Sequence, residues 1–440
     1  MSSAIGVGLL GLGTVGQGVS RILWENSGHV EMRAGRSIRM IAAVVRDLSK
    51  SRNLLDPETV ITDDPNVVLA NPEIDIVLEA MGGIEPARTY ILRALQAGKH
   101  VVTANKALLA DHGPELFEAA RQAERSLCFE AAVGGGIPII QGLQVGLAAN
   151  RILSISAILN GTCNFILTAM TRDGKAYEDV LAEAQKRGYA ESDPTMDVDG
   201  TDTTHKLAVL VQIAFGMNVN TSEIPRQGID RLDRMDIQYA AELGYTVKLL
   251  AKAIHRETGL ELRVAPTLVP RNSQLADISD SFNAVQVVGD AVGETLFAGR
   301  GAGMMPTASA MVSDLIGIAI EPQSRIRTTA TLWQIRDRNN NLIKTEDHQT
   351  RFYLRFQIAD RPGQLAELTR ILGEQGISIA SVIQHDPGGS DESVSSVPLI
   401  IMTHQANWGA LNKALQNLKG MGTLHADPIV LEVDSHTRKN

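Results

Sequence analysis

Residues 5–16 read IGVGLLGLGTVG, and this stretch decides the fold of the first part of the chain. An apolar strand runs into a turn with glycines at Gly11, Gly13 and Gly16, and a helical pattern follows. In such a turn the first glycine bends the chain, the second lets a pyrophosphate approach the backbone, and the third allows close helix–strand contact. An overlapping glycine frame beginning at Gly6 lies inside the strand, so only the later frame fits this mechanism.

Strands and helices continue to alternate through the first third of the chain. Apolar runs predict strands at residues 38–45, 74–78 and 100–103, and a helix is predicted at residues 85–97. This alternation is typical of an α/β fold with a doubly wound parallel sheet of the Rossmann type. Together with the glycine turn, it predicts a dinucleotide-binding domain over residues 1–135.

Composition excludes several classes of protein. A chain of 440 residues predicts roughly two to four domains. The net charge of −9 and the lack of a basic run argue against a nucleic-acid partner. Two cysteines make a disulfide framework improbable in this length, and no stretch is apolar enough for a membrane span. The first residues lack a basic leader, so we expect a cytoplasmic protein with no membrane partner.

The end of the second predicted strand bears on which dinucleotide binds. An acid at this position would bind a ribose 2′-hydroxyl, whereas an arginine suits a 2′-phosphate. Here Val45 is followed by Arg46 and Asp47, with Lys50 close behind. This order favours NADP, and NAD stays open if Asp47 reaches the ribose.

The acidic block GYAESDPTMDVDGTDTTHK, residues 188–206, precedes an apolar helix. Asp202 and Lys206 stand four residues apart and therefore share one helical face. Leu207 and Leu210 continue an apolar stripe beside Lys206, which predicts a half-buried lysine next to a carboxylate. Such a pair positions an ammonium group for proton transfer or charge stabilisation. The alternative is a solvated acidic loop.

Six blocks in order make the chain resemble homoserine dehydrogenases with a C-terminal ACT domain. The blocks are GLGTVG (11–16), VVTANKALLA (101–110), EAAVGGGIPII (130–140), LNGTCNFIL (159–167), residues 188–206, and GRGAGMMPTASA (299–310). The resemblance covers nearly the whole chain. It implies NAD(P)-dependent interconversion of L-homoserine and L-aspartate 4-semialdehyde, in threonine, methionine and isoleucine biosynthesis. It also implies a substrate-binding domain at residues 136–334, and a dinucleotide domain completed by part of residues 300–330.

The same resemblance assigns site residues position by position. The implied catalytic residues are Lys106 and Lys206, which flank the reacting carbon, and Asp202, which orients Lys206. The implied substrate-binding residues are Glu191, Asp197, Gly161 and Thr162. The implied cofactor-binding residues are Gly11, Gly13, Thr14, Val15, Gly16, Arg46, Lys50, Thr103, Lys106 and Gly303. A monovalent cation, Na⁺, would be bound by Glu130, Val133, Gly135 and Ile137. Which lysine transfers the proton is left open.

A separate domain is predicted at the C-terminal end. Residues 335–350 are polar and predict a linker, and residues 351–434 show the order βαββαβ of a ferredoxin-like unit. This unit resembles an ACT domain, with L-threonine the implied effector and Gly363 and Leu365 near the ligand. A dimerisation module without ligand is the alternative. We expect truncation after Arg336 to leave a folded, active enzyme, and the resemblance implies a homodimer or homotetramer.

Two other functions were weighed on the residues. Cys163 in NGTCNF, with His205 as base, would be the nucleophile of an acylating aldehyde dehydrogenase. Cys163 opens an apolar helical run, however, and a small buried thiol is the commoner explanation. A non-enzymatic NADP-binding sensor is the other possibility. The constellation of Lys106, Asp202 and Lys206 argues against it, since a sensor has no use for a proton-transfer group.

Overall fold

The structure, a computed structural model, describes residues 4–52, 56–322, 341–385, 396–420 and 424–434. These residues form two compact units. The first unit comprises residues 1–161, 202–224 and 282–340, and the second comprises residues 162–201, 225–281 and 341–440. The units do not coincide with the predicted domains, whose boundaries stay predictions. None of the helices formed by the described residues is long and apolar enough to cross a membrane.

The N-terminal part of the first unit is a parallel sheet of six strands in the order β3-β2-β1-β4-β5-β6. The strands are β1 (Ile5–Leu10), β2 (Ile38–Val44), β3 (Val60–Thr62), β4 (Ile76–Glu79), β5 (His100–Thr103) and β6 (Leu127–Cys128). All neighbouring strands pair in parallel, with Leu10 opposite both Val44 and Glu79. The strand order reverses on either side of β1, which confirms the predicted doubly wound sheet.

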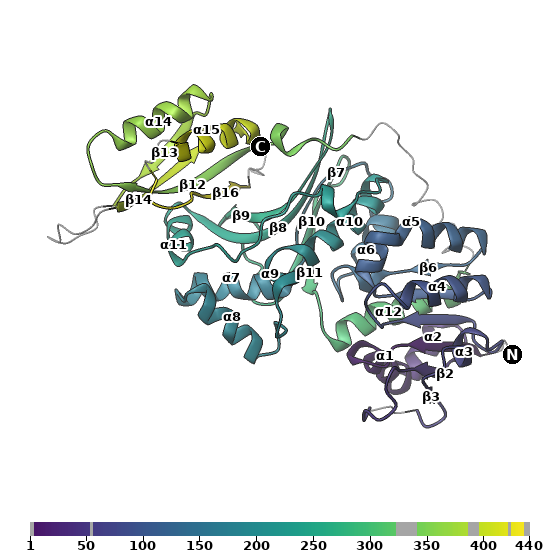
Figure 1. The fold of residues 1–440 in the computed structure, drawn as a ribbon. Coiled ribbons are helices and arrows are strands. Elements are labelled where there is room, and N and C mark those ends of the chain that lie inside the picture. Colours follow the sequence, from purple (N-terminus) through teal and green to yellow (C-terminus); the bar gives the residue numbers. More distant parts are fainter. Residues whose placement is uncertain (1–3, 53–55, 323–340, 386–395, 421–423, 435–440) are drawn as a thin grey trace. The chain divides into compact units, whose positions relative to one another are not determined.

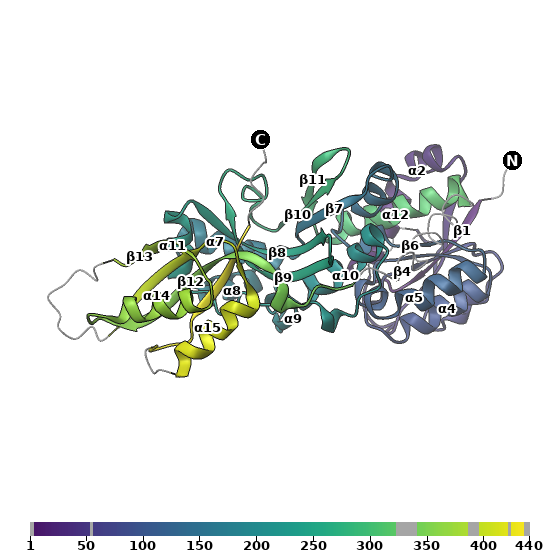
Figure 2. The same cartoon turned by 90° about the horizontal axis from the view of Figure 1, so that it is seen from above.

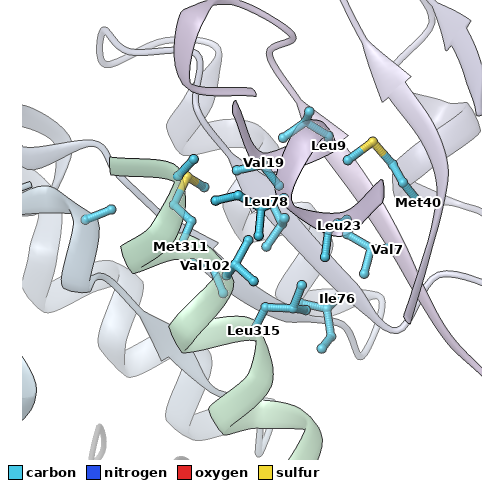
Figure 3. Close-up of a cluster of buried hydrophobic side chains, with 14 of the residues drawn as sticks. Val7, Leu9, Val19, Leu23, Met40, Ile76, Leu78, Val102, Met311 and Leu315 are labelled. Carbon is cyan, nitrogen blue, oxygen red and sulfur yellow. The ribbon is translucent and has the colours of Figure 1, made fainter. Parts of the chain in front are cut away.

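Helices cover both faces of this sheet (Figures 1 and 2). One face carries α1 (Thr14–Glu25), α2 (Ser27–Ala34) and α12 (Met304–Ile320), and the other carries α3 (Asn66–Leu69), α4 (Ala87–Gln96) and α5 (Lys106–Gln122). Figure 3 shows the apolar core under α12, where Met311 and Leu315 meet Val19 of α1 and Val102 of β5. Helix α12 thus joins a core whose other buried members all lie between Ile5 and Ala131.

The rest of the first unit contains three antiparallel strands. Strands β7 (Ile152–Ile158), β10 (Phe282–Gly289) and β11 (Gly293–Arg300) lie in the order β11-β10-β7. Between β6 and β7 the chain forms the short helix α6 (Ile139–Gln141), and α10 (Thr201–Phe215) carries the end of the acidic block. From Ile139 the chain stays helical, first as α6 and then as a π-helix over Gly142–Gly146, and turns lead from there to β7.

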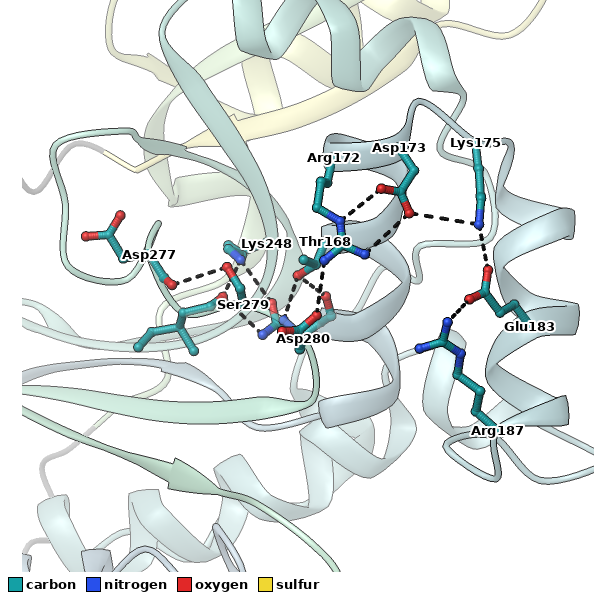
Figure 4. Close-up of polar contacts among 12 residues, drawn as sticks. Thr168, Arg172, Asp173, Lys175, Glu183, Arg187, Lys248, Asp277, Ser279 and Asp280 are labelled. Atoms are coloured by element: carbon teal, nitrogen blue, oxygen red, sulfur yellow. Dashed lines mark hydrogen bonds and ion pairs between the residues drawn. The ribbon is translucent and has the colours of Figure 1, made fainter.

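The second unit begins with helical elements and a long hairpin. Its elements are α7 (Gly161–Asp173), α8 (Tyr177–Lys186), α9 (Thr195–Val198), α11 (Arg234–Glu242), β8 (Tyr245–Arg256) and β9 (Gly259–Pro270). Lys248 of β8 is fully buried, and its Nζ donates to Asn164 Oδ1 at 3.1 Å and to the Ile278 carbonyl at 2.5 Å. Figure 4 shows Lys248 beside the loop after β9, and the Asp280 amide of this loop donates to Thr168 Oγ1 of helix α7 at 3.1 Å. Burial lowers the pKa of Lys248 to about 8, although Asp277 and Asp280 oppose this shift.

The C-terminal part of the second unit is the predicted βαββαβ domain. Its elements are β12 (Gln349–Ala359), α14 (Gln364–Glu374), β13 (Ile379–Ile383), β14 (Ser396–Thr403), β15 (Ala406–Asn407), α15 (Trp408–Gly420) and β16 (Ile429–Val433). The sheet runs β16-β12-β14-β13, and α14 and α15 pack together on one face of it (Figure 1). Of the predicted linker, residues 335–340 lie outside the described residues, and Leu342 forms a bridge with Leu260 of β9.

A buried ion cluster fixes β16 to the hairpin β8–β9. Strands β16 and β9 pair in parallel, with Glu432 opposite Thr267. The Glu432 carboxylate lies 2.5 Å from both Lys252 Nζ and Arg263 Nε, and it accepts a bond from Trp408 Nε1 at 3.1 Å. Burial alone would raise the pKa of Glu432, but the two cations outweigh it and lower this pKa to about 2.

A second buried ion pair joins β12 to helix α11. The Arg355 guanidinium donates to both oxygens of Asp236, at 2.6 and 2.9 Å, and Tyr353 Oη donates to the same carboxylate at 3.1 Å. Asp236 is fully buried and therefore depends on these donors. The C-terminal domain is not a detachable appendage: it supplies the counter-charges for three buried residues of α11, β8 and β9.

This dependence reverses the expectation for truncation after Arg336. The shortened chain leaves Asp236, Lys252 and Arg263 without their partners, and breaking one buried pair costs about 3–5 kcal/mol. We therefore predict a chain that aggregates or unfolds at a clearly lower temperature than the full-length protein in differential scanning calorimetry. A truncated chain that unfolds cooperatively at the full-length midpoint contradicts this.

Point variants of two arginines distinguish the effect of losing a buried ion pair from the effect of deleting the whole C-terminal domain. Arg355→Met is expected to lower the free energy of unfolding by about 3 kcal/mol, since Asp236 stays buried without its cation. Arg370→Met is the matched control, because Arg370 is exposed and pairs only with Glu374 on the same helix. Its change should stay within about 0.5 kcal/mol in chemical denaturation.

Lys248 predicts a pH dependence of stability. Below about pH 8 the lysine is protonated in both folded and unfolded chains, so the cost of burying its charge is fully present. As the pH rises from 8 toward 10.5, the folded state loses this proton first, the unfolded state binds more protons, and stability rises. The free energy of unfolding of the wild type, minus that of Lys248→Met, should grow by about 2 kcal/mol over this window. A flat difference across urea titrations at these pH values disproves the shift.

Candidate active site

A carboxylate bridged by two lysines lies in the first unit. Lys106 is the first residue of α5, three positions beyond β5, and its Nζ lies 3.1 Å from Asp202 Oδ1. Lys206 Nζ lies 2.7 Å from Asp202 Oδ2, one helical turn along α10. The side chains of Asp202 and Lys206 are each 10% exposed, whereas that of Lys106 is 38% exposed. Sequence spacing predicted the Asp202–Lys206 pair, and the fold adds Lys106 to it.

Backbone and amide groups complete the surroundings of this carboxylate. Asn160 Nδ2 donates to Asp202 Oδ2 at 3.0 Å, and Lys206 Nζ donates to the Leu159 carbonyl at 2.7 Å. Burial would raise the pKa of Asp202, but the charges of Lys206 and Lys106 outweigh it and hold this pKa well below its usual range. Asp202 is therefore an anion that lies between two ammonium groups.

Glu79 organises the turn that carries Lys106, and sequence reasoning missed it. This fully buried carboxylate ends β4 and accepts bonds from Thr103 Oγ1 at 2.5 Å and from the amides of Met81 and Gly82 at 2.7 and 3.3 Å. Asn105 then caps α5 by accepting from the Leu108 amide. Burial raises the pKa of Glu79, and the hydrogen bonds counter it only in part. The sequence did offer one signal for Glu79, because this carboxylate directly follows the strand predicted at residues 74–78.

The glycine turn has the geometry that a dinucleotide needs. Gly11 adopts φ 99°, and a Cβ there would lie 2.7 Å from the Ala80 carbonyl oxygen. A Cβ on Gly16 would lie 2.2 Å from the Gly11 carbonyl oxygen, so both positions require glycine. Gly13 faces open space at the N-terminus of α1, where no side chain caps the first amides. Those amides are free to bind a pyrophosphate.

A cavity of about 850 Å³ opens beside this turn. Its lining includes Gly11, Gly13, Thr14, Arg46 and Lys50. The remaining predicted cofactor residues lie outside the lining: Val15, Gly16, Thr103, Lys106 and Gly303.

The loop after β2 separates the cationic groups of this cavity by role. Arg52 is engaged with the chain, donating to the carbonyls of Lys50 and Asp47 at 2.9 and 2.8 Å. The Asp47 carboxylate accepts bonds from the amide and hydroxyl of Ser49, which lower its pKa. Arg46 is exposed at the rim of the cavity. Asp47 therefore closes its own turn, whereas Arg46 and Lys50 are exposed side chains in the cavity lining.

In the second unit, two carboxylates of the acidic block close local turns, and two others are the predicted substrate-binding residues. Asp193 Oδ1 accepts from the amide and hydroxyl of Thr195 at 3.1 and 2.6 Å, and so closes the turn that leads into α9. Asp199 accepts from the amide and hydroxyl of Thr201 in the same way. Glu191 is exposed and Asp197 half-buried within α9. Two of the carboxylates thus serve the local fold, and the substrate-binding prediction rests on the other two.

The NGTCNF motif is held by its backbone and hydroxyl groups. Gly161 begins α7, and Thr162 Oγ1 donates to the Tyr189 carbonyl at 2.7 Å. Cys163 is fully buried, and its Sγ donates to the Asp197 carbonyl at 3.2 Å. A nucleophilic cysteine has to be accessible as a thiolate, so this environment argues against the acylating reading.

The predicted cation loop offers oxygen ligands only. Glu130 is buried, and its carboxylate accepts from the amides of Ile140 and Gln141 at 2.8 and 2.9 Å. Gly134 and Gly135 adopt φ 74° and 56°, so the loop passes through the left-handed region at two successive residues. No group of three or more His, Cys, Asp or Glu in the described ranges is placed to bind a metal. One carboxylate with carbonyls suits a hard monovalent ion rather than a transition metal.

Three parts of the chain match known families. Residues 138–316 match homoserine dehydrogenase, residues 11–130 match the homoserine dehydrogenase NAD-binding domain, and residues 352–420 match the ACT domain. A homoserine dehydrogenase of Pseudomonas aeruginosa is 42% identical over 432 residues, covering 97% of this chain and 98% of that protein. The chain belongs to the homoserine dehydrogenase family.

Solved structures agree with this membership. The crystal structure of a homoserine dehydrogenase from Thiobacillus denitrificans has a TM-score of 0.92 at 43% identity and covers 98% of both chains. A hyperthermophilic archaeal homoserine dehydrogenase in complex with NADPH has a TM-score of 0.61 at 26% identity, covering 73% of this chain and 98% of that one. The predictions of a homoserine dehydrogenase fold, an NAD(P)-dependent oxidoreductase and an ACT domain are confirmed.

Proposed function

We propose that this homoserine dehydrogenase interconverts L-homoserine and L-aspartate 4-semialdehyde, and that Lys106, Asp202 and Lys206 carry the proton chemistry. The bridging of one buried carboxylate by two ammonium groups carries this proposal. Oxidising the alcohol requires a base for its hydroxyl proton, and reducing the aldehyde requires positive charge where the alkoxide develops. NADP supplies the hydride acceptor when bound, and NADPH the donor.

The environments of the two lysines support different roles. Lys206 is held by Asp202 and by the Leu159 carbonyl, which leaves one of its three N–H bonds for a ligand. Lys106 has Asp202 as its ion partner and is far more exposed. We assign Lys106 the proton exchange with solvent and Lys206 the fixed charge that stabilises the alkoxide oxygen.

For the cofactor we propose NADP, with NAD as the alternative. The pyrophosphate would bind at the start of α1, against Gly11, Gly13, Thr14, Val15 and Gly16. The 2′-phosphate would bind to Arg46 and Lys50. Asp47 supports this choice, because its bonds to Ser49 compete with a ribose hydroxyl. Thr103 ends β5 and Gly303 caps α12 at φ 120°, and we place both near the cofactor.

For the substrate we propose that Glu191 and Asp197 hold the α-ammonium group, beside Gly161 and Thr162. The support is chemical: Asp193 and Asp199 accept bonds from neighbouring turn residues, Asp202 pairs with two lysines, and Glu191 and Asp197 are the other carboxylates of this block. For Na⁺ we propose the Glu130 carboxylate with the carbonyls of Val133, Gly135 and Ile137. A bound cation would fix the loop that leads into α6.

For regulation we propose L-threonine bound at the turn into α14. Gly363 caps this helix at φ 92°, no side chain caps its amides, and Leu365 is 40% exposed. A helix N-terminus of this kind favours a carboxylate.

We also propose a cytoplasmic homodimer or homotetramer, without nucleic-acid or membrane partners. The negative charge supports the absence of a nucleic-acid partner.

The reaction is tested by turnover of L-homoserine with NADP and of L-aspartate 4-semialdehyde with NADPH. Lys106→Ala and Lys206→Ala should each lower kcat/KM by at least about a hundredfold, because each removes a positioned charge or proton carrier. Cys163→Ala should be nearly silent, and the exposed Lys186→Ala serves as control. Near-normal turnover in both active-site variants rules out the assignment.

The cofactor assignment is tested by Arg46→Ala. Loss of a charge-assisted bond to a 2′-phosphate should weaken NADP relative to NAD by about ten- to a hundredfold in KM. Arg33→Ala is the control, since Arg33 is an exposed arginine of α2 outside the cavity lining. Equal losses for both cofactors would mean that Arg46 supports only the fold.

The effector is tested on the full-length enzyme with L-threonine at millimolar concentrations. We expect inhibition, calorimetric binding, and a several-fold weaker response in Gly363→Ala, because a side chain at φ 92° forces the turn to rearrange. Gly373→Ala is the matched control, since a Cβ there meets nothing and Gly373 lies inside α14. If the wild-type enzyme shows no inhibition by threonine and no binding of it, threonine is not the ligand.

A further inference from the structure

Residues 225–229 form a short segment between α10 and α11, named here the bracing segment. Its backbone runs alongside β9: the Gln227 amide donates to the Val264 carbonyl at 2.8 Å, and the Val264 amide donates to the Pro225 carbonyl at 2.9 Å. Arg226 and Val264 form a parallel bridge. The bracing segment is therefore fixed to a central strand of the second unit.

The bracing segment also supports helix α9 in the acidic block. The Ile229 amide donates to the Val198 carbonyl at 2.9 Å. A Cβ on Gly228 would lie 2.5 Å from the Val198 carbonyl oxygen and 2.9 Å from Asp199 Cα. Only glycine permits this approach. Helix α9 has four residues, too few to be stable alone, so contacts of this kind set its position.

The third contact reaches the C-terminal domain. Gln227 Nε2 donates to the Val430 carbonyl of β16 at 3.2 Å. Strand β9 pairs with β16 at Glu432 and Val433, which follow Val430 in the chain. The Gln227 amide thus adds a contact to β16 before the point where β9 begins to pair with it. Figure 2 labels α9, β9 and β12 in this unit.

We propose that Gln227 is a positioning residue for substrate binding, which holds the α9 turn in register with strand β16 of the C-terminal domain. The proposal rests on the assignment of Asp197 to the substrate's ammonium group. Because Asp197 lies within α9, a shift of the bracing segment moves this carboxylate and changes the affinity for substrate. Glu432, fixed by Lys252 and Arg263, anchors the same strand two residues after Val430.

Steady-state kinetics of the full-length enzyme test the proposal. Gln227→Ala removes the bond to Val430 and keeps the backbone bonds, and Gln227→Glu keeps the shape but cannot donate. Both should raise KM for L-homoserine by about five- to tenfold, the range of one lost hydrogen bond, with kcat and KM for NADP nearly unchanged. Gln357→Ala is the matched control, because its amide donates only to Ser396 within the C-terminal domain. Equal KM in all variants overturns the proposal.

Hydrogen exchange provides a readout that does not depend on substrate. Mass spectrometry of a peptide covering residues 195–200 should show faster amide exchange in both Gln227 variants and not in Gln357→Ala. Unchanged exchange overturns the positioning role of Gln227, whatever the kinetics. If Gln227→Ala exchanges faster but KM is normal in both Gln227→Ala and Asp197→Asn, the substrate role of Asp197 is wrong. The failure of the positioning role and the failure of the proposed substrate site therefore give different results.

Discussion

A carboxylate removed from water has to be compensated by cations and hydrogen-bond donors, and Asp202 imposes this constraint on the candidate active site. Two lysines and the Asn160 amide meet it. Their geometry follows from three parts of the chain: the turn after β5, the end of β7 and the first turn of α10. Because the carboxylate needs both ammonium groups, it brings together residues separated by about one hundred positions.

The same constraint explains why the C-terminal domain is integral to the second unit. Glu432 of the C-terminal domain is buried and pairs with Lys252 and Arg263 of the β8–β9 hairpin. Asp236 of helix α11 is also buried and pairs with Arg355 of the C-terminal domain. A module designed to move freely would present a polar, weakly contacting surface. Here removal of either side leaves buried charge without a partner. The C-terminal domain and the β8–β9 hairpin are therefore expected to respond to a ligand as one body.

Local features of the fold could be predicted from the sequence. The apolar run of β1, the glycine turn and the i, i+4 spacing of Asp202 and Lys206 are all short-range patterns, and the structure has them where they were expected. Glu79 was missed because its role depends on Thr103, twenty-four residues away and on a neighbouring strand. The buried pairs of Glu432 and Asp236 were missed for the same reason: nothing in the local sequence marks their distant partners.

The acidic block shows how far composition can mislead about chemistry. Its carboxylates look equivalent in the sequence, yet Asp193 and Asp199 are occupied by hydroxyl and amide donors two residues ahead. This capping geometry shapes the turns on either side of α9 and so determines where Asp197 lies. Asp202, in the first turn of the next helix, instead pairs with the two lysines. Two of the acids in this loop therefore shape its own turns, and only the others are candidates for a chemical role.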